Sequence, residues 1–226
     1  MQVYCQLPAY MEARKRMNQA TPTSRQRQRE QTRSQILAAA VKIFARSGFE
    51  AASLADIARE AGVKKALVQY HFSTKEQLWK DAATRLWTER NSRLAEVVEG
   101  RCADDLNDRM RQGFTALVEF TRENPEWLWF MFHEASVNGP RRQWLTDTFL
   151  REDYRLGEKF VTLFQEHGVI RQGSPLHILH LISGALTYNL LVAPQTLLVT
   201  GTDLASEESI TQQVALLQTL LSPQDK

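Results

Sequence analysis

Two lysines and a glutamine share one short helical stretch, at a spacing that suits contact with a polyanion. Lys64, Lys65 and Gln69 lie within residues 64–72. A lysine ammonium group can neutralise a phosphate or reach a guanine edge, and a glutamine amide can form two hydrogen bonds with adenine. The chemistry that these residue types predict is nucleic-acid recognition.

The elements that must position these side chains are two short helices joined by a glycine turn. Ser53 and Asp56 form a capping pattern that begins the first helix, and Gly62 ends it. Helices of about two turns are not stable alone, and a helix–turn–helix unit presents its second helix to the DNA major groove. A plain helical hairpin with solvated lysines is the alternative. The inward positions expected for the second helix are Leu67, Val68 and Phe72.

Longer helices are predicted on either side of this unit. Apolar residues at helical spacing indicate a first helix over roughly residues 25–47, which stops at Gly48. Ser73 and Glu76 form a second capping pattern, which predicts a long helix from about Thr74 to Gly100.

The remaining sequence continues in helical patterns, without strand alternation or an internal repeat. The fold class is therefore predicted to be all-α, with about nine or ten helices. We expect a flexible basic arm over 1–24, a helix-turn-helix domain over 25–73, and a C-terminal domain over 74–226. The further helices are expected over roughly 104–123, 125–137 and 175–192, with a last one from Ser206. Between the second and third of these, a loop at Asn138-Gly139-Pro140 is expected to precede another helical stretch that ends at about His167.

Charge is distributed unevenly along the chain. Residues 1–80 carry 14 Lys and Arg against 6 Asp and Glu, whereas residues 81–226 carry 14 against 20. The basic first third predicts a polyanionic partner. Cys5 and Cys102 lie far apart, which argues against a disulfide framework and favours a reducing, cytoplasmic compartment. No signal peptide is expected in residues 1–20, and no membrane span, on the premise that no apolar stretch of roughly 18 residues runs free of charge.

Residues 33–79 resemble the N-terminal DNA-binding domain of the TetR family of transcriptional repressors, over about a fifth of the chain. The resemblance implies that Lys75 and Ser53, at the starts of two helices, bind backbone phosphate. It also implies a dimeric repressor that a small organic ligand releases from a palindromic operator in double-stranded DNA. The matching positions are Phe44, Gly48-Phe49, Ser53, Ile57-Ala58, Ala61-Gly62-Val63, His71-Phe72 and Lys75-Glu76-Gln77-Leu78.

Two positions of the second short helix depart from the family pattern. Lys64 stands where the family commonly has serine, and Gln69 stands where it usually has a tyrosine that touches phosphate. Tyr70 points about 100° away from Gln69 around the helix, so Gln69 becomes a candidate for reading a base edge. The expected DNA-binding set is Arg25, Arg27, Arg29, Arg33, Ser53, Lys64, Lys65, Gln69, Tyr70, His71 and Lys75.

The C-terminal half is expected, from the resemblance, to form a homodimer and to bind the small effector. The helices at roughly 149–167 and 175–192 are the candidates for the dimer contact. Residues 127–132 are apolar all round, which suits either an aromatic ligand pocket or an ordinary aromatic core. The candidate ligand-binding residues are Trp87, Phe114, Trp127, Phe130, His133, Glu134, Tyr188 and Asn189.

The sequence carries no pattern typical of an enzyme. It has no glycine-rich phosphate loop, nucleophile elbow or metalloprotease histidine pair. His177 and His180 share a helix face, but a metal site would need further ligands, so no metal or cofactor is expected. A helical protein-interaction adaptor without specific DNA binding is the alternative function.

Overall fold

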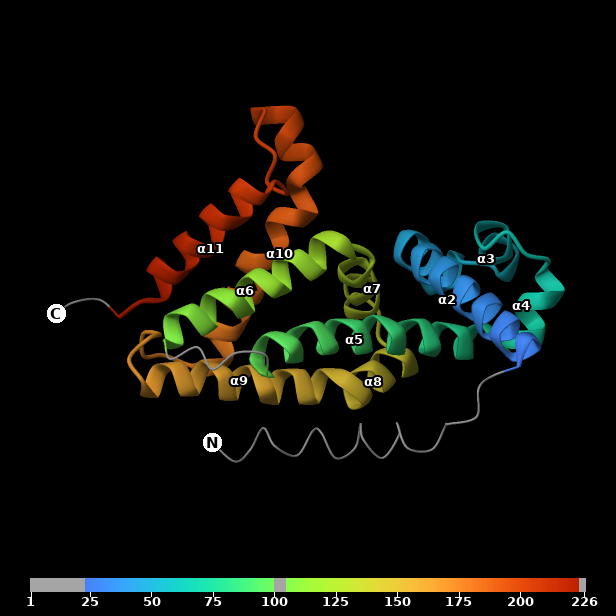
Figure 1. Ribbon diagram of the computed structural model, residues 1–226, viewed down its shortest axis with the longest axis horizontal. Helices are drawn as coiled ribbons and strands as arrows, with labels where there is room; N and C mark the ends of the chain where they lie inside the picture. The colour runs from blue at the N-terminus through green and yellow to red at the C-terminus, as the bar shows by residue number, and fades with distance from the viewer. Residues whose placement is uncertain (1–22, 100–104, 224–226) are drawn as a thin grey trace.

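The structure, a computed structural model, describes residues 23–99 and 105–223, with Cys5, Cys102 and nearly all of the expected arm over 1–24 outside these ranges. The described residues contain helices and no strand, which confirms the all-α prediction (Figure 1). The elements are α2 (Ser24–Ala51), α3 (Leu54–Glu60), α4 (Lys65–His71), α5 (Lys75–Glu99), α6 (Leu106–Glu123), α7 (Glu126–Ala135), α8 (Pro140–Leu145), the π-helix η2 (Thr146–Leu150), α9 (Arg151–Glu166), α10 (Pro175–Thr200) and α11 (Glu207–Leu221).

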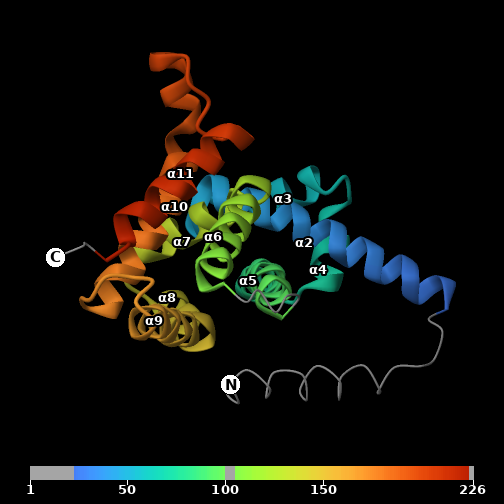
Figure 2. The same ribbon diagram turned by 60° about the vertical axis from the view of Figure 1, so that its left-hand side comes forward.

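Helices α2, α3 and α4 form a unit at one end of the molecule, here called the head (Figure 1). The remaining elements, from α5 to α11, are here called the body, and α5 extends from the head along it (Figure 1). Thr23 and Gln26 form a capping box that begins α2. The first turns of α2 project beyond the body in the turned view (Figure 2). Its later turns are apolar on the side that packs against α3, α5 and α7.

The described helices enclose two cores. The second is built by α6, α9, α10 and α11 around residues such as Val161, Ile182 and Val214. The first joins the head to α5, α7 and α8, so the head does not stand apart from the body. Members of that first core include Ile36, Phe44, Ile57, Val68, Trp79, Trp87, Trp127, Phe130 and Leu145.

The regular part of the first helix stops at Gly48, as predicted, because the backbone there leaves helical geometry. Helical structure continues to Ala51 across a kink, at which Gly48 has φ 70° and ψ 175°. A Cβ built on Gly48 would lie 3.2 Å from Nδ1 of His133, on α7. Gly48 therefore ends the regular part of α2 beside α7, and Phe49 and Glu50 follow in the short turn after the kink.

Other boundaries differ from the expected ones. The helical stretch expected to end at about His167 is α8, η2 and α9 in succession, because the π-helical segment η2 interrupts the α-helical hydrogen bonding. Pro140, expected in a loop, is instead the first residue of α8. Thr74 rather than Ser73 caps α5, since its hydroxyl accepts a hydrogen bond from the backbone N–H of Gln77 at 3.0 Å. Leu67, expected to point inward, is 36% exposed.

Helix α10 overturns the premise used to exclude a membrane span. It runs for 26 residues without Asp, Glu, Lys or Arg, and it is long and apolar enough to cross a membrane by length and composition. In the fold it packs along α9, α6 and α11. One side, with Ile178, Ile182 and Leu186, is buried, whereas Leu181 and Tyr188 remain exposed.

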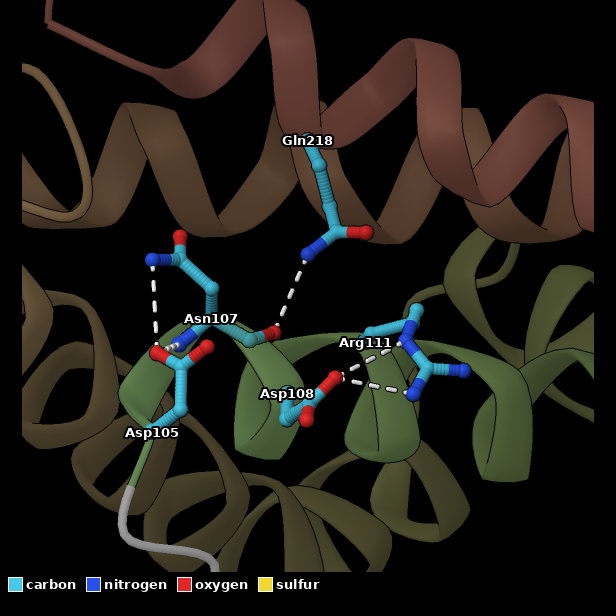
Figure 3. Close-up of polar contacts among 5 residues, drawn as sticks. All are labelled: Asp105, Asn107, Asp108, Arg111 and Gln218. Atoms are coloured by element: carbon cyan, nitrogen blue, oxygen red, sulfur yellow. Dashed lines mark hydrogen bonds and ion pairs between the residues drawn. The ribbon is translucent and has the colours of Figure 1, made fainter.

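Polar contacts fix the start of α6 and tie it to α11 (Figure 3). The carboxylate of Asp105 accepts a hydrogen bond from the backbone N–H of Asn107 at 2.9 Å, which caps the helix. Nε2 of Gln218, on α11, donates to the carbonyl of Asn107 at 3.1 Å. Asp108 pairs with Arg111 at 2.8 Å along the exposed side of the same helix.

Candidate nucleic-acid interface

A tight turn sets the angle between α3 and α4. The N–H of Val63 donates to the carbonyl of Ala58 at 2.9 Å, and the N–H of Gly62 donates to that of Arg59 at 3.2 Å. These two bonds define a Schellman motif, which requires a left-handed residue at its centre. Gly62 meets that requirement with φ 66°. The turn thus fixes the direction in which α4 leaves the head.

Helix α4 has one buried side and one broad exposed side. Val68 and, just after the helix, Phe72 are buried in the first core. Lys64, Lys65 and Gln69 are exposed, and the Tyr70 side chain is 68% exposed. The expected lysines, glutamine and tyrosine are therefore all exposed, with Lys64 at the N-cap of α4 and the other three within the helix.

The arginines of α2 differ in their surroundings. Arg25, Arg27 and Arg29 are on the exposed first turns, and the Arg29 guanidinium lies 5.7 Å from the Tyr70 ring centroid. Arg33 instead forms an ion pair with Asp81 of α5 at 2.5 Å and lies over Phe72. Arg33 is thereby occupied in joining α2 to α5.

Ser53 and Lys75, the two residues expected to bind phosphate at helix starts, both form hydrogen bonds within the chain. Ser53 Oγ donates to a carboxylate oxygen of Asp56 at 2.6 Å and accepts from the Asp56 N–H at 3.1 Å. The hydrogen bond from Ser53 is the main reason that the pKa of Asp56 is lowered. Lys75 Nζ donates to the carbonyl of Glu50 at 3.2 Å and lies 4.4 Å from the Phe49 ring centroid.

His71 lies at the end of α4 among cations. Partial burial of the ring, followed by the nearby charges of Arg29 and Arg33, lowers the pKa of His71 below its ordinary value. The lowered pKa favours the neutral imidazole. A DNA phosphate close by would act in the opposite direction and favour the charged form.

The candidate ligand-binding residues are dispersed rather than gathered around one cavity. Glu134 is buried in an ion pair with Arg141 of α8. Tyr188 and Asn189 lie on α10, where Tyr188 is exposed. The aromatic members fill the two cores, with Trp87, Trp127 and Phe130 in the first and Phe114 in the second.

An open groove of about 550 Å³ lies between the head and α7. His133 stands in it and binds the end of α2, with Nε2 3.0 Å from the carbonyl oxygen of Ala45. Trp129, which is not among the candidate ligand-binding residues, also lines the groove, and its spacing of four from His133 places both on one side of α7. The groove is lined by Lys42, Ala45, Arg46, Glu60, Pro125, Glu126, Trp129 and His133.

The turn, the one-sided α4 and the basic first turns of α2 define a helix-turn-helix protein. Residues 36–82 match the family model described as bacterial regulatory proteins, tetR family. Over this segment the chain is similar to the DNA-binding domain of the TetR family.

Individual relatives match parts of the chain. It is 28% identical over 113 residues to the transcriptional activator FasR of Mycolicibacterium smegmatis, covering 50% of this chain and 51% of FasR. It is 37% identical over 68 residues to the nicotine-responsive repressor HdnoR of Paenarthrobacter nicotinovorans, covering 30% and 35%. The chain thus spans about half or less of the length of these curated relatives.

Similarity to a solved structure extends over most of the fold. The hemolysin II transcriptional regulator HlyIIR superposes with a TM-score of 0.65 at 24% sequence identity, covering 88% of this chain and 99% of that one. At this identity the likeness shows that the two chains share a fold.

Proposed function

We propose that this protein is a sequence-specific DNA-binding transcriptional regulator that acts as a homodimer. The observation that carries the proposal is the outer surface of α4, where Lys64, Lys65, Gln69 and Tyr70 are exposed while Val68 anchors the helix. Long donors on a helix of this kind suit phosphates and base edges in the major groove.

Dimerisation follows from the small size of the reading surface and from the exposed side of α10. One helix of seven residues reads too few base pairs for tight specific binding, whereas two related by a two-fold axis read a palindrome. Leu181, Gly184 and Tyr188 recur at helical spacing and are all exposed. A Cβ on Gly184 would meet nothing within 4 Å in the single chain, so a partner helix can approach closely here. We assign this stripe to the dimer contact.

The effector is proposed to bind in the groove between the head and α7, and to release the dimer from its operator. Trp129 offers a half-exposed indole for an aromatic molecule, and Lys42 and Arg46 offer cations for an acidic group. Because the groove is lined by residues of both α2 and α7, a ligand bound in it would contact both the head and the body. A ligand that binds better when the head is turned out of register would shift the population away from DNA.

The DNA-binding proposal is tested with the purified chain and the DNA upstream of its own gene. Gel shifts and footprinting should show two symmetric half-sites whose centres lie about 34–36 Å apart or somewhat more. Replacing Lys64 and Lys65 by alanine should weaken binding and make the salt dependence shallower by about two units, one for each phosphate contact. Lys159→Ala, on exposed α9, is the matched control and should change neither. A chain that binds no DNA specifically would support the helical adaptor instead.

The effector proposal is tested with aromatic acids, screened by tryptophan fluorescence and gel shift together. A compound that quenches fluorescence and releases DNA should lose both effects in Trp129→Ala. Phe132→Ala is the matched control, because Phe132 is exposed on the same helix but does not line the groove. If the compound still releases DNA from Trp129→Ala, the effector binds elsewhere. If the compound tightens DNA binding, the ligand promotes binding to the operator instead of releasing the protein from it.

A further inference from the structure

Arg141, in the first turn of α8, connects the body to the bent end of α2. Its Nε lies 3.3 Å from a carboxylate oxygen of Glu134, and its terminal nitrogen lies 3.2 Å from that of Glu50. Its guanidinium carbon lies 3.8 Å from the ring centroid of Phe49. The Arg141 side chain is 15% exposed and Glu134 is 4% exposed, so this pair is largely desolvated, whereas the Glu50 side chain is 82% exposed.

The same two residues of α2 hold Lys75. Phe49 presents its ring to the Lys75 ammonium group at 4.4 Å, and the Glu50 carbonyl accepts the hydrogen bond from that group at 3.2 Å. Phe49 and Glu50 are therefore shared between an arginine from the body and a lysine at the start of α5. Arg141 binds the Glu50 carboxylate and Lys75 binds the Glu50 carbonyl, so the Phe49 ring is the group that both cations contact.

We propose that Arg141 is a positioning residue for DNA binding, which holds Phe49 and Glu50 so that Lys75 is aimed at a phosphate. The inference rests on the proposed function, in which Lys75 contacts the DNA backbone. A planar guanidinium can lie against a ring and bind two carboxylates at once, which an ammonium group cannot do in the same geometry. Without Arg141, Glu134 is left buried without its cation, and the turn that carries Phe49 and Glu50 is free to shift.

The expected effect of losing this support is modest and specific. Without this support, the Lys75 side chain would become ordered only when it binds DNA. The conformational entropy lost in that step corresponds to a loss of about 2- to 10-fold in DNA affinity. The loss should disappear when Lys75 itself is absent. A residue that merely stabilises the fold would weaken binding by the same factor whether or not Lys75 is present.

The test is a double-mutant cycle of Arg141→Gln and Lys75→Ala, read by DNA affinity at fixed salt and fixed temperature. Arg141→Gln should weaken binding in the parent and have no further effect in Lys75→Ala. Arg142→Gln is the matched control, because Arg142 is the exposed neighbour that binds Asn138, and it should leave affinity unchanged. Arg141→Lys, which keeps the charge beside Glu134, provides a folded variant if Arg141→Gln does not fold, and it should show the same dependence on Lys75.

The outcomes separate this inference from the proposed function. Equal losses from Arg141→Gln with and without Lys75, or no loss in the parent, overturn the positioning role while DNA binding stands. If Lys75→Ala leaves affinity and salt dependence unchanged, Lys75 is not a phosphate contact and the inference falls with that role. If the parent chain binds no DNA, the proposed function itself fails.

Discussion

Gly48 provides a sharp test of the junction between head and body, because two separate costs oppose any side chain there. Its φ of 70° and ψ of 175° lie in a region that essentially only glycine occupies, and placing another residue there costs about 1–3 kcal/mol. A Cβ would also lie 3.2 Å from Nδ1 of His133, so the ring would have to move by a few tenths of an ångström. That movement strains the bond between His133 Nε2 and the Ala45 carbonyl, which contributes about 0.5–1.5 kcal/mol.

Gly48→Ala is therefore expected to lower the free energy of unfolding by roughly 2–4 kcal/mol. The assay is urea unfolding followed by circular dichroism, at one fixed protein concentration because dimerisation adds to apparent stability. In a His133→Ala background the contact with the ring is gone and only the backbone cost remains. The penalty of Gly48→Ala should then fall by about 0.5–1.5 kcal/mol.

Gly62→Ala is the matched control for the backbone cost alone. Gly62 has φ 66°, and a Cβ there would meet nothing within 4 Å. Its penalty should be about 1–2 kcal/mol and should not depend on His133. A Gly48→Ala penalty below about 0.5 kcal/mol, the range typical of surface substitutions, would show that the kink of α2 is not held as described. An undiminished penalty in the His133→Ala background would remove the role given to the imidazole.

Three further predictions concern DNA and the dimer. Gln69→Ala should relax preference at one base position by ~1–3 kcal/mol, measured on single-base operator variants, and an equal loss on all of them would identify a phosphate contact instead. A DNA phosphate near His71 would raise its lowered pKa, so that binding takes up a proton. Affinity should then rise as pH falls from 8 to 6, and His71→Gln should flatten that dependence. In the free protein the sign is opposite: the contribution of His71 to stability is present above about pH 6.5 and is lost as pH falls below it. Leu181→Glu should yield monomers in sedimentation analysis, whereas Leu216→Glu on α11, similarly exposed, should leave the dimer intact.

The sequence by itself determined the helix-turn-helix unit, because the signals that build it are local. The Ser53 cap and the Gly62 turn each act over four or five residues, and the apolar period of α4 acts over two turns. Such signals operate before the rest of the chain is in place. The all-α class could be predicted for the same reason, and the similarity to the TetR family over residues 36–82 followed from the motifs that these signals form.

Tertiary contacts decided which residues of a given type do which task. Arg29 and Arg33 look alike in the sequence, but only the position of Asp81 shows that Arg33 is tied to α5. An aromatic residue has the same hydrophobicity in a core as in a groove, so Trp127 and Trp129 could not be separated until the packing of α7 was known. Sequence spacing sets the side of a helix, not what lies opposite it.

The contacts at the junction between head and body could not be predicted from the sequence, for a physical reason. Phe49, Lys75 and Arg141 meet within a few ångströms, although up to 92 positions separate them in the chain. The local propensity of these residues does not favour their contact. The contact arises because the kink at Gly48 and the first core bring four helix ends together, namely the ends of α2 and α7 and the starts of α5 and α8. The residue types at these positions were fixed by the sequence, but their coupling exists only in the folded chain.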